Sequence, residues 1–165
     1  MKKLAMMVAL LATFTLTAMA QTPWKIINME DVTRHGGNCD YDDETCTATF
    51  TGKSDRWIDL PGVKGDLTEH TKLKMTFLKA TCMIKVCLRY KDAEGNTKQV
   101  DASTLYGTMG KTIESKKSTT IDLTNKGKIG EDVLKNITSI RIAMAKAVDG
   151  NEEPWMVQFG EVVMP

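Results

Sequence analysis

The pentapeptide RWIDL, which begins at Arg56, combines side chains that suit the recognition of a sugar. Carbohydrate sites use a flat apolar surface for the C–H face of a sugar ring and polar groups for its hydroxyls. Trp57 supplies such a surface, with Asp59 and Arg56 as polar neighbours. Tyr106, in the polar stretch 102–118, is a second aromatic candidate. The competing interpretation is that Trp57 only covers the end of a hydrophobic core, because tryptophan is highly buried on average.

Strand geometry decides which of these side chains share a face. Successive residues of a β-strand point to opposite sides. If Ile58 faces the core, Trp57 and Asp59 therefore face outward together.

A short acidic stretch, DYDDET, lies between Cys39 and Cys46. Asp40, Asp42 and Glu44 occupy alternate positions, so an extended strand would place their carboxylates on one face. Some sandwich-fold glycoside hydrolases arrange their acid and nucleophile on a strand in a similar way, at a controlled separation. A loop would instead offer oxygen ligands to calcium. We favour a solvated acidic loop, because the stretch contains few residues with high β-propensity.

Four cysteines permit three pairings, and the sequence alone leaves them open. We predict a disulfide between Cys39 and Cys46, and a buried thiol at Cys82. On one strand Cys82 and Cys87 would be roughly 16 Å apart on opposite faces, whereas a disulfide needs Cα atoms within about 7 Å. Cys87 is then either free on the outer face or covered by another segment.

The amino-terminal segment has the pattern of a signal peptide. Lys2 and Lys3 precede an uncharged apolar run, and Ala18-Met19-Ala20 places small residues where a signal peptidase reads them. We expect cleavage before Gln21 and an exported protein, periplasmic or secreted. The apolar run is too short and too weakly flanked to be preferred as a membrane span.

The mature chain, residues 21–165, is long enough for one domain. Of 22 lysines and arginines, two belong to the signal, which leaves 20 against 21 acidic residues and a net charge of about −1. This balance argues against a nucleic-acid-binding protein. We also find no HExxH, GxSxG or glycine-rich phosphate loop and no zinc-ligand spacing, so we predict that the protein is not an enzyme.

A two-residue alternation of apolar and polar side chains recurs along the chain and predicts half-buried antiparallel strands. The expected inward residues are Ala48, Phe50, Leu73, Met75, Phe77, Cys82, Ile84, Val86, Leu88, Tyr90, Ile121, Leu123, Ile140, Ile142 and Met144. Turn residues separate the segments, and only 130–137 suggests a short helix. We expect an all-β, two-sheet antiparallel sandwich of eight or nine strands, a jelly roll.

The last strand contains one irregularity. Trp155, which we expect in the core, shares a face with Val157 and Phe159, and strict alternation would add Glu161. A bulge at Gly160 would turn Glu161 outward, and we favour it because an unpaired buried carboxylate is costly. The alternative keeps Glu161 inward as a cation ligand.

The segments RWIDLPG, LTEHTKLKMTFLKATCMIKVCLRYKD, STTIDLT, ITSIRIAMA and VQFGEVVM occur in an order that resembles the galactose-binding-like jelly rolls of secreted bacterial glycan-degrading systems. The resemblance covers residues 24 to 164. It implies a domain that binds carbohydrate without cleaving it, and in several members a structural calcium beside the first and last strands. Glu30, Asp31 and Glu161 fall in comparable places.

Two hypotheses follow. The first is a secreted, non-catalytic carbohydrate-binding domain whose glycan contacts Trp57, Asp59, Arg56 and Tyr106, with no cofactor other than a structural calcium at Glu30, Asp31 and Glu161. The second is a structural or protein-interaction sandwich with no small ligand. A glycoside hydrolase is a distant third.

Overall fold

The computed structural model describes residues 24–104 and 112–165. The predicted signal peptide and Tyr106 lie outside these residues. The described chain forms ten β-strands, one 3-10 turn and one four-residue α-helix. Their bounds are β1 Lys25–Ile27, η1 Met29–Asp31, β2 Cys39–Asp42, β3 Thr47–Phe50, β4 Trp57–Asp59, β5 Lys72–Ala80, β6 Cys82–Lys91, β7 Thr97–Thr104, β8 Lys117–Asp122, α1 Glu131–Leu134, β9 Ile137–Ala147 and β10 Trp155–Met164.

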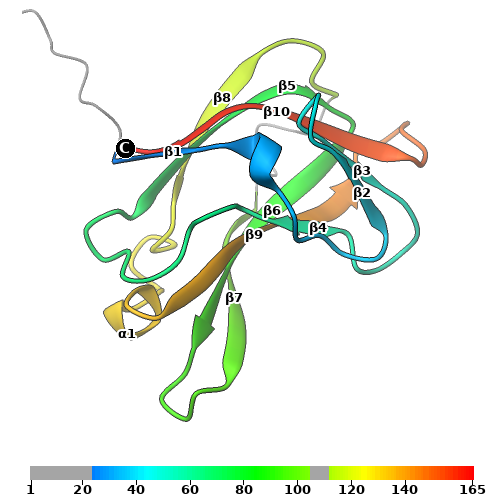
Figure 1. Cartoon of the computed structure of the whole chain (residues 1–165). Coiled ribbons are helices and arrows are strands. Elements are labelled where there is room, and N and C mark those ends of the chain that lie inside the picture. The colour runs from blue at the N-terminus through cyan, green and yellow to red at the C-terminus, as the bar shows by residue number, and fades with distance from the viewer. Residues whose placement is uncertain (1–23, 105–111) are drawn as a thin grey trace, which may run out of the picture.

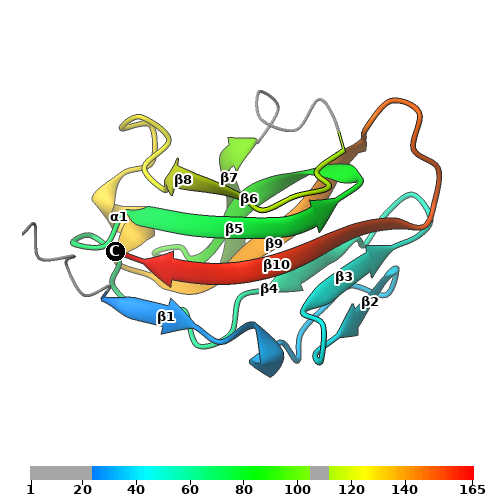
Figure 2. The same ribbon diagram turned by 90° about the horizontal axis from the view of Figure 1, so that it is seen from above.

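The strands form two antiparallel sheets that face each other (Figures 1 and 2). The larger sheet has the order β2-β3-β10-β5-β8, with β1 also pairing with β10. The smaller sheet has the order β4-β9-β6-β7. The predicted all-β, two-sheet antiparallel sandwich is confirmed. Its strand order is compatible with a jelly roll, although the described residues contain ten strands rather than eight or nine.

The hydrophobic core lies between the sheets, as the alternation predicts. Leu73, Met75 and Phe77 of β5 are buried, as are Ile140 and Ile142 of β9. The Phe77 ring also packs against Phe159 of β10, with 5.9 Å between the ring centroids. Truncating a phenylalanine in such a core costs about 3–5 kcal/mol, so this face of each strand is strongly specified.

Gly160 marks a bulge in β10, as predicted. Phe159 pairs with Phe77 and Val162 with Met75, so β10 contains one residue more than β5 over this interval. The extra residue shifts the phase of the strand. Val162 is therefore buried, while Glu161 is exposed.

One local prediction is wrong. The acidic stretch is not a loop throughout, because Asp40 and Asp42 belong to β2, which pairs along its whole length with β3. Tertiary pairing overrides the low propensity of CDYD, since Cys39 is buried and Tyr41 packs against the core.

Candidate functional site

The outer face of the smaller sheet contains the two central residues of the predicted site. Ile58 of β4 is fully buried, so Trp57 and Asp59 point away from the core, as the alternation predicts. Trp57 remains half-buried. Asp59 is only 4% exposed, which is rare for a carboxylate without partners.

The partner of Asp59 is Arg141, which lies directly opposite it on β9. Nε of Arg141 donates to Oδ1 of Asp59 at 2.7 Å, and Nη2 donates to Oδ2 at 3.2 Å. This two-pronged geometry is the strongest form of a carboxylate–guanidinium contact. The pair therefore satisfies both oxygens of the buried carboxylate.

Two further arginines approach the same carboxylate. Nη2 of Arg34 and Nη1 of Arg89 each lie 3.7 Å from Oδ2 of Asp59, within ion-pair range but too far for a hydrogen bond. We call Arg34, Arg89 and Arg141 around Asp59 the arginine cluster. It carries three positive charges around one negative charge.

Arg34 reaches the cluster because its segment runs beside β4. The amide of Asp59 donates to the carbonyl of Arg34 at 2.9 Å, and the amide of Gly36 donates to the carbonyl of Trp57 at 2.8 Å. His35 forms a bridge with Ile58 between these two bonds. The segment thus covers the edge of β4 and places the Arg34 side chain on the outer face.

Trp57 is fixed by its neighbours on both its edge and its face. Its indole Nε1 donates to Oδ1 of Asp55 at 2.7 Å. The guanidinium carbon of Arg141 lies 3.3 Å from the ring centroid, a cation–π contact. The hydrogen bonds from Trp57 and from the amide of Gly37 lower the pKa of Asp55. One face of the indole is therefore occupied, and a ligand has only the other face to stack on.

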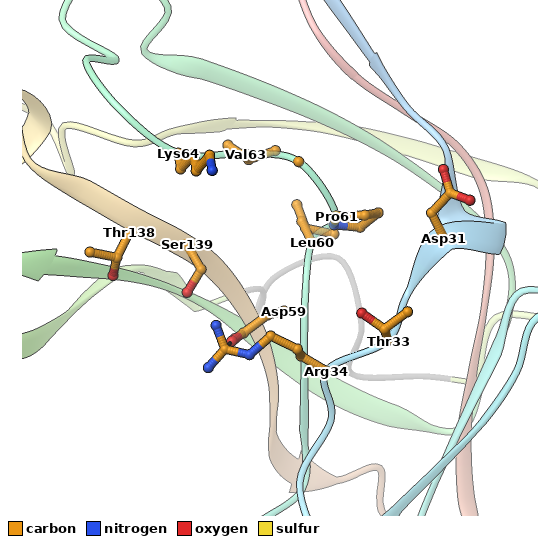
Figure 3. Close-up of a pocket in the computed structure, with 11 residues that line it drawn as sticks. Asp31, Thr33, Arg34, Asp59, Leu60, Pro61, Val63, Lys64, Thr138 and Ser139 are labelled. Carbon is orange, nitrogen blue, oxygen red and sulfur yellow. Dashed lines mark ion pairs between the residues drawn. The ribbon is translucent and has the colours of Figure 1, made fainter.

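A cleft of about 260 Å³ adjoins the arginine cluster. Figure 3 shows the Arg34 guanidinium beside Asp59, with Ser139 of the neighbouring strand pointing toward them. Lys64 and Val63 lie on the loop above (Figure 3). The lining residues are Asp31, Thr33, Arg34, Asp59, Leu60, Pro61, Gly62, Val63, Lys64, Thr138 and Ser139. Among the described residues, only the Ser139 hydroxyl is a buried side-chain polar atom without a hydrogen-bond partner.

The structure does not bring Arg56 to Trp57. Arg56 points to the other side of the chain, as the strand alternation requires of neighbouring residues. Its guanidinium lies 5.5 Å from the centroid of the Trp155 ring, and its Nη1 donates to the carbonyl of Gly52. Trp155 is half-buried and packs against the core. Of the predicted ligand-binding residues in the described ranges, Trp57 and Asp59 share a site and Arg56 lies apart.

The predicted calcium ligands are all at the surface. Glu30 and Asp31 are exposed on η1, and Glu161 is exposed beside the bulge. Within residues 24–104 and 112–165, no three histidine, cysteine or acidic side chains gather in a way that could hold a metal ion. Calcium binding by Glu30, Asp31 and Glu161 stays a prediction that the geometry does not support.

The predicted disulfide between Cys39 and Cys46 is not formed, and all four cysteines are free thiols. The β2–β3 hairpin separates the pair: Asp42 pairs with Thr47 at the turn beside Cys46, while Cys39 lies three residues back along the strand. That distance is roughly 10 Å, beyond the reach of a disulfide. Cys82 is buried, as predicted, and burial raises its pKa to about 12.

Cys87 lies on the outer face and is nonetheless fully buried. Its thiol donates to Oδ1 of Asp101 at 3.2 Å, and Asp101 forms an ion pair with Lys85 at 3.0 Å. Burial, followed by the contact with Asp101, raises the pKa of Cys87 to about 12. The second of the two predicted alternatives, a thiol covered by another segment, therefore holds.

Sequence reasoning missed Arg34, Arg89, Arg141 and Ser139. The sequence pattern did indicate that Arg141 faces outward, because its neighbours Ile140 and Ile142 are predicted to face the core. The missing information was the register that places Arg141 opposite Asp59, 82 residues earlier in the chain.

Comparisons with protein-family models, with curated proteins and with solved structures found no match to this chain. Within the described residues, no helix has the length and apolar character needed to cross a membrane.

Proposed function

We propose that this protein is an exported, non-catalytic carbohydrate-binding domain that contacts its glycan through the outer face of the smaller sheet, with Trp57 as the stacking surface. The observation that carries the proposal is that Trp57 is held by Asp55 and Arg141 while part of it stays accessible. A tryptophan that only fills the core would be fully buried. A tryptophan that only lies on the surface would not need both a hydrogen bond to its Nε1 and a cation–π contact on its ring.

Rigidity of the indole favours binding. Ordering a mobile side chain at an interface costs about 0.5–1.5 kcal/mol, and Trp57 is already ordered by its hydrogen bond to Asp55 and its contact with Arg141. The free face of the ring offers a flat apolar surface to the C–H side of a sugar. Arg34 and Lys64, which line the adjacent cleft, supply donors for hydroxyl groups.

Asp59 supports a binding role rather than a catalytic one. Glycoside hydrolysis requires two carboxyl groups, one as acid and one as nucleophile or base. Both oxygens of Asp59 accept hydrogen bonds from Arg141, and the side chain is buried. The group therefore orients arginines on the sheet face.

The resemblance to galactose-binding-like jelly rolls agrees with the two-sheet antiparallel architecture. Export, which rests on the amino-terminal pattern of Lys2, Lys3 and Ala18-Met19-Ala20, would bring the domain to extracytoplasmic glycans.

A second candidate is a protein-interaction sandwich without a small ligand. It is favoured by β1, where Ile26 is 68% exposed, and by Trp24 just before the strand, which is 46% exposed. Exposed apolar side chains on a sheet edge are typical of sites that pair with another chain.

A glycan array with residues 21–165 distinguishes the two candidates. The proposal predicts binding to at least one glycan, with affinity reduced about tenfold or more by Trp57→Ala, as for a buried aromatic anchor. Trp24→Ala is the matched control, since it removes an exposed tryptophan elsewhere. Binding that survives Trp57→Ala, or no binding to any glycan, would overturn the proposal.

A further inference from the structure

Resting on the proposed function, we propose that the carbohydrate carries an anionic group, a carboxylate or a sulfate, which binds in the cleft against Arg34 and Ser139. The neutral hydroxyls of the same ligand would then lie toward Trp57.

The first argument is the distribution of charge. The arginine cluster has two more positive than negative charges, and the single carboxylate is saturated by Arg141. Within the described residues, the side chains of Arg34 and Arg89 form no hydrogen bond, only their 3.7 Å ion pairs with Asp59. Each guanidinium has five N–H donors in a fork that matches a carboxylate or sulfate. The donors that Asp59 leaves unfilled are thus suited to an anion.

The second argument is the Ser139 hydroxyl. Ser139 is 5% exposed, lines the cleft, and pairs across the sheet with Arg89. Its oxygen has no hydrogen-bond partner within the described chain. Buried polar groups are nearly always hydrogen-bonded, and an orphan hydroxyl calls for a partner that enters the site. An anionic oxygen accepts the proton of this hydroxyl and also the N–H groups of arginine.

Exposure separates the roles of the arginines. The Arg34 side chain is 62% exposed, whereas that of Arg141 is 13% exposed and already bound to Asp59 and Trp57. Arg34 is therefore the ligand-contacting residue and Arg141 the positioning residue. Asp31, the other carboxylate of the cleft, lies well away from Arg34 and Ser139 (Figure 3), and it accepts a hydrogen bond from Asn28.

The dimensions allow one ligand to contact both features. The cleft of about 260 Å³ is close to the lower limit of ligand pockets, roughly 300 Å³. It suits one sugar unit or its charged substituent. Trp57 and Asp59 are two residues apart on the same face, roughly 7 Å, so a glycan longer than one ring reaches the indole.

The experiment compares matched charged and neutral glycans. Binding of residues 21–165 is measured for polygalacturonate against its fully methyl-esterified form, and for dextran sulfate against dextran. The inference predicts binding to one charged member, at least about tenfold tighter than to its neutral partner, and weakened by salt. The first pair identifies a carboxylate, and the second a sulfate.

The Arg34→Gln variant locates the binding. Arg34→Gln should remove the preference for the charged member, and Arg56→Gln, which alters an arginine beside the Trp155 ring, should leave the preference intact. Equal binding of charged and neutral members, with loss in Trp57→Ala, would overturn the inference and leave the proposed function standing. A charge preference unchanged in Arg34→Gln would also overturn it. Binding to no glycan here or on the array would overturn the proposed function itself.

Discussion

Arg141 lies over the ring of Trp57, with its guanidinium carbon 3.3 Å from the centroid of the indole ring. The same side chain donates two hydrogen bonds to Asp59. The planar guanidinium can stack and form a fork at once, which a lysine cannot do. One residue of β9 thereby orients both predicted site residues of β4.

Removing Asp59 should be more destabilising than removing an exposed carboxylate. Asp59→Ala leaves three arginines without their shared countercharge, and breaking a buried pair costs about 3–5 kcal/mol. Because Arg34 is mostly exposed, we expect the lower end, about 3 kcal/mol. Urea unfolding of the wild type and of Asp59→Ala measures this loss of stability. Glu131→Ala is the control: Glu131 is exposed, so the loss of its ion pair with Lys135 should have little effect on stability. Equal losses in the two variants would contradict this account.

Gly36 should not tolerate a methyl group, whereas Gly37 should. A Cβ at Gly36 would lie 1.9 Å from the carbonyl oxygen of Asp55 and 2.9 Å from Nε1 of Trp57. We expect Gly36→Ala to destabilise the fold by about 1–3 kcal/mol, as overpacking does. At Gly37 the nearest atom, Oδ2 of Asp55, is 3.4 Å away, so Gly37→Ala should be nearly neutral. The free energies of unfolding of the two variants are compared with that of the wild type. An unchanged free energy of unfolding in Gly36→Ala would contradict the close contact between Gly36 and the Asp55 carbonyl.

Acidification should weaken the hydrogen bond that the Asp55 carboxylate accepts from the Trp57 indole. The hydrogen bond from Trp57, and then that from Gly37, lower the folded-state pKa of Asp55 below 3.8. The contribution of Asp55 to stability is therefore complete above pH 3.8 and is lost as the pH falls through the lower, folded-state pKa. The free energy of unfolding, measured for the wild type and Asp55→Asn across this range, should converge as the pH falls. A gap that stays constant with pH would contradict the shift.

The cysteines should react in a defined order with a thiol reagent. Burial raises the pKa of Cys39, Cys82 and Cys87 to about 12, so their thiolates are scarce and shielded at neutral pH. Cys46 is half-buried and should react first in the native protein. In denaturant, without reductant, four thiols should be counted. A count of two would contradict this prediction and show that one disulfide forms.

The limits of sequence reasoning are visible in particular residues. The alternation of Leu73, Met75 and Phe77 predicts their burial because a strand has a fixed period of two. The bulge at Gly160 could be predicted because Glu161 would otherwise be buried unpaired. Both arguments use only neighbours along the chain.

The arginine cluster could not be predicted in this way. Arg34 precedes β2, Arg89 lies on β6 and Arg141 on β9, and they meet at Asp59 only through the strand order and register of the smaller sheet. Register between distant strands depends on packing of the whole sandwich rather than on local pattern. The strand β2 was missed for the related reason that its pairing with β3 outweighs the propensity of its own residues.

The indole N–H signals of Trp24, Trp57 and Trp155, followed by nuclear magnetic resonance during titration with the glycan that gives the strongest array signal, test the central claim most directly. Assignment by Trp57→Phe identifies the signal that matters. We predict that the Trp57 signal shifts saturably while those of Trp24 and Trp155 stay in place. A shift confined to Trp24 or Trp155, or binding that leaves the Trp57 signal unmoved, would contradict the assignment of the outer sheet face as the glycan site.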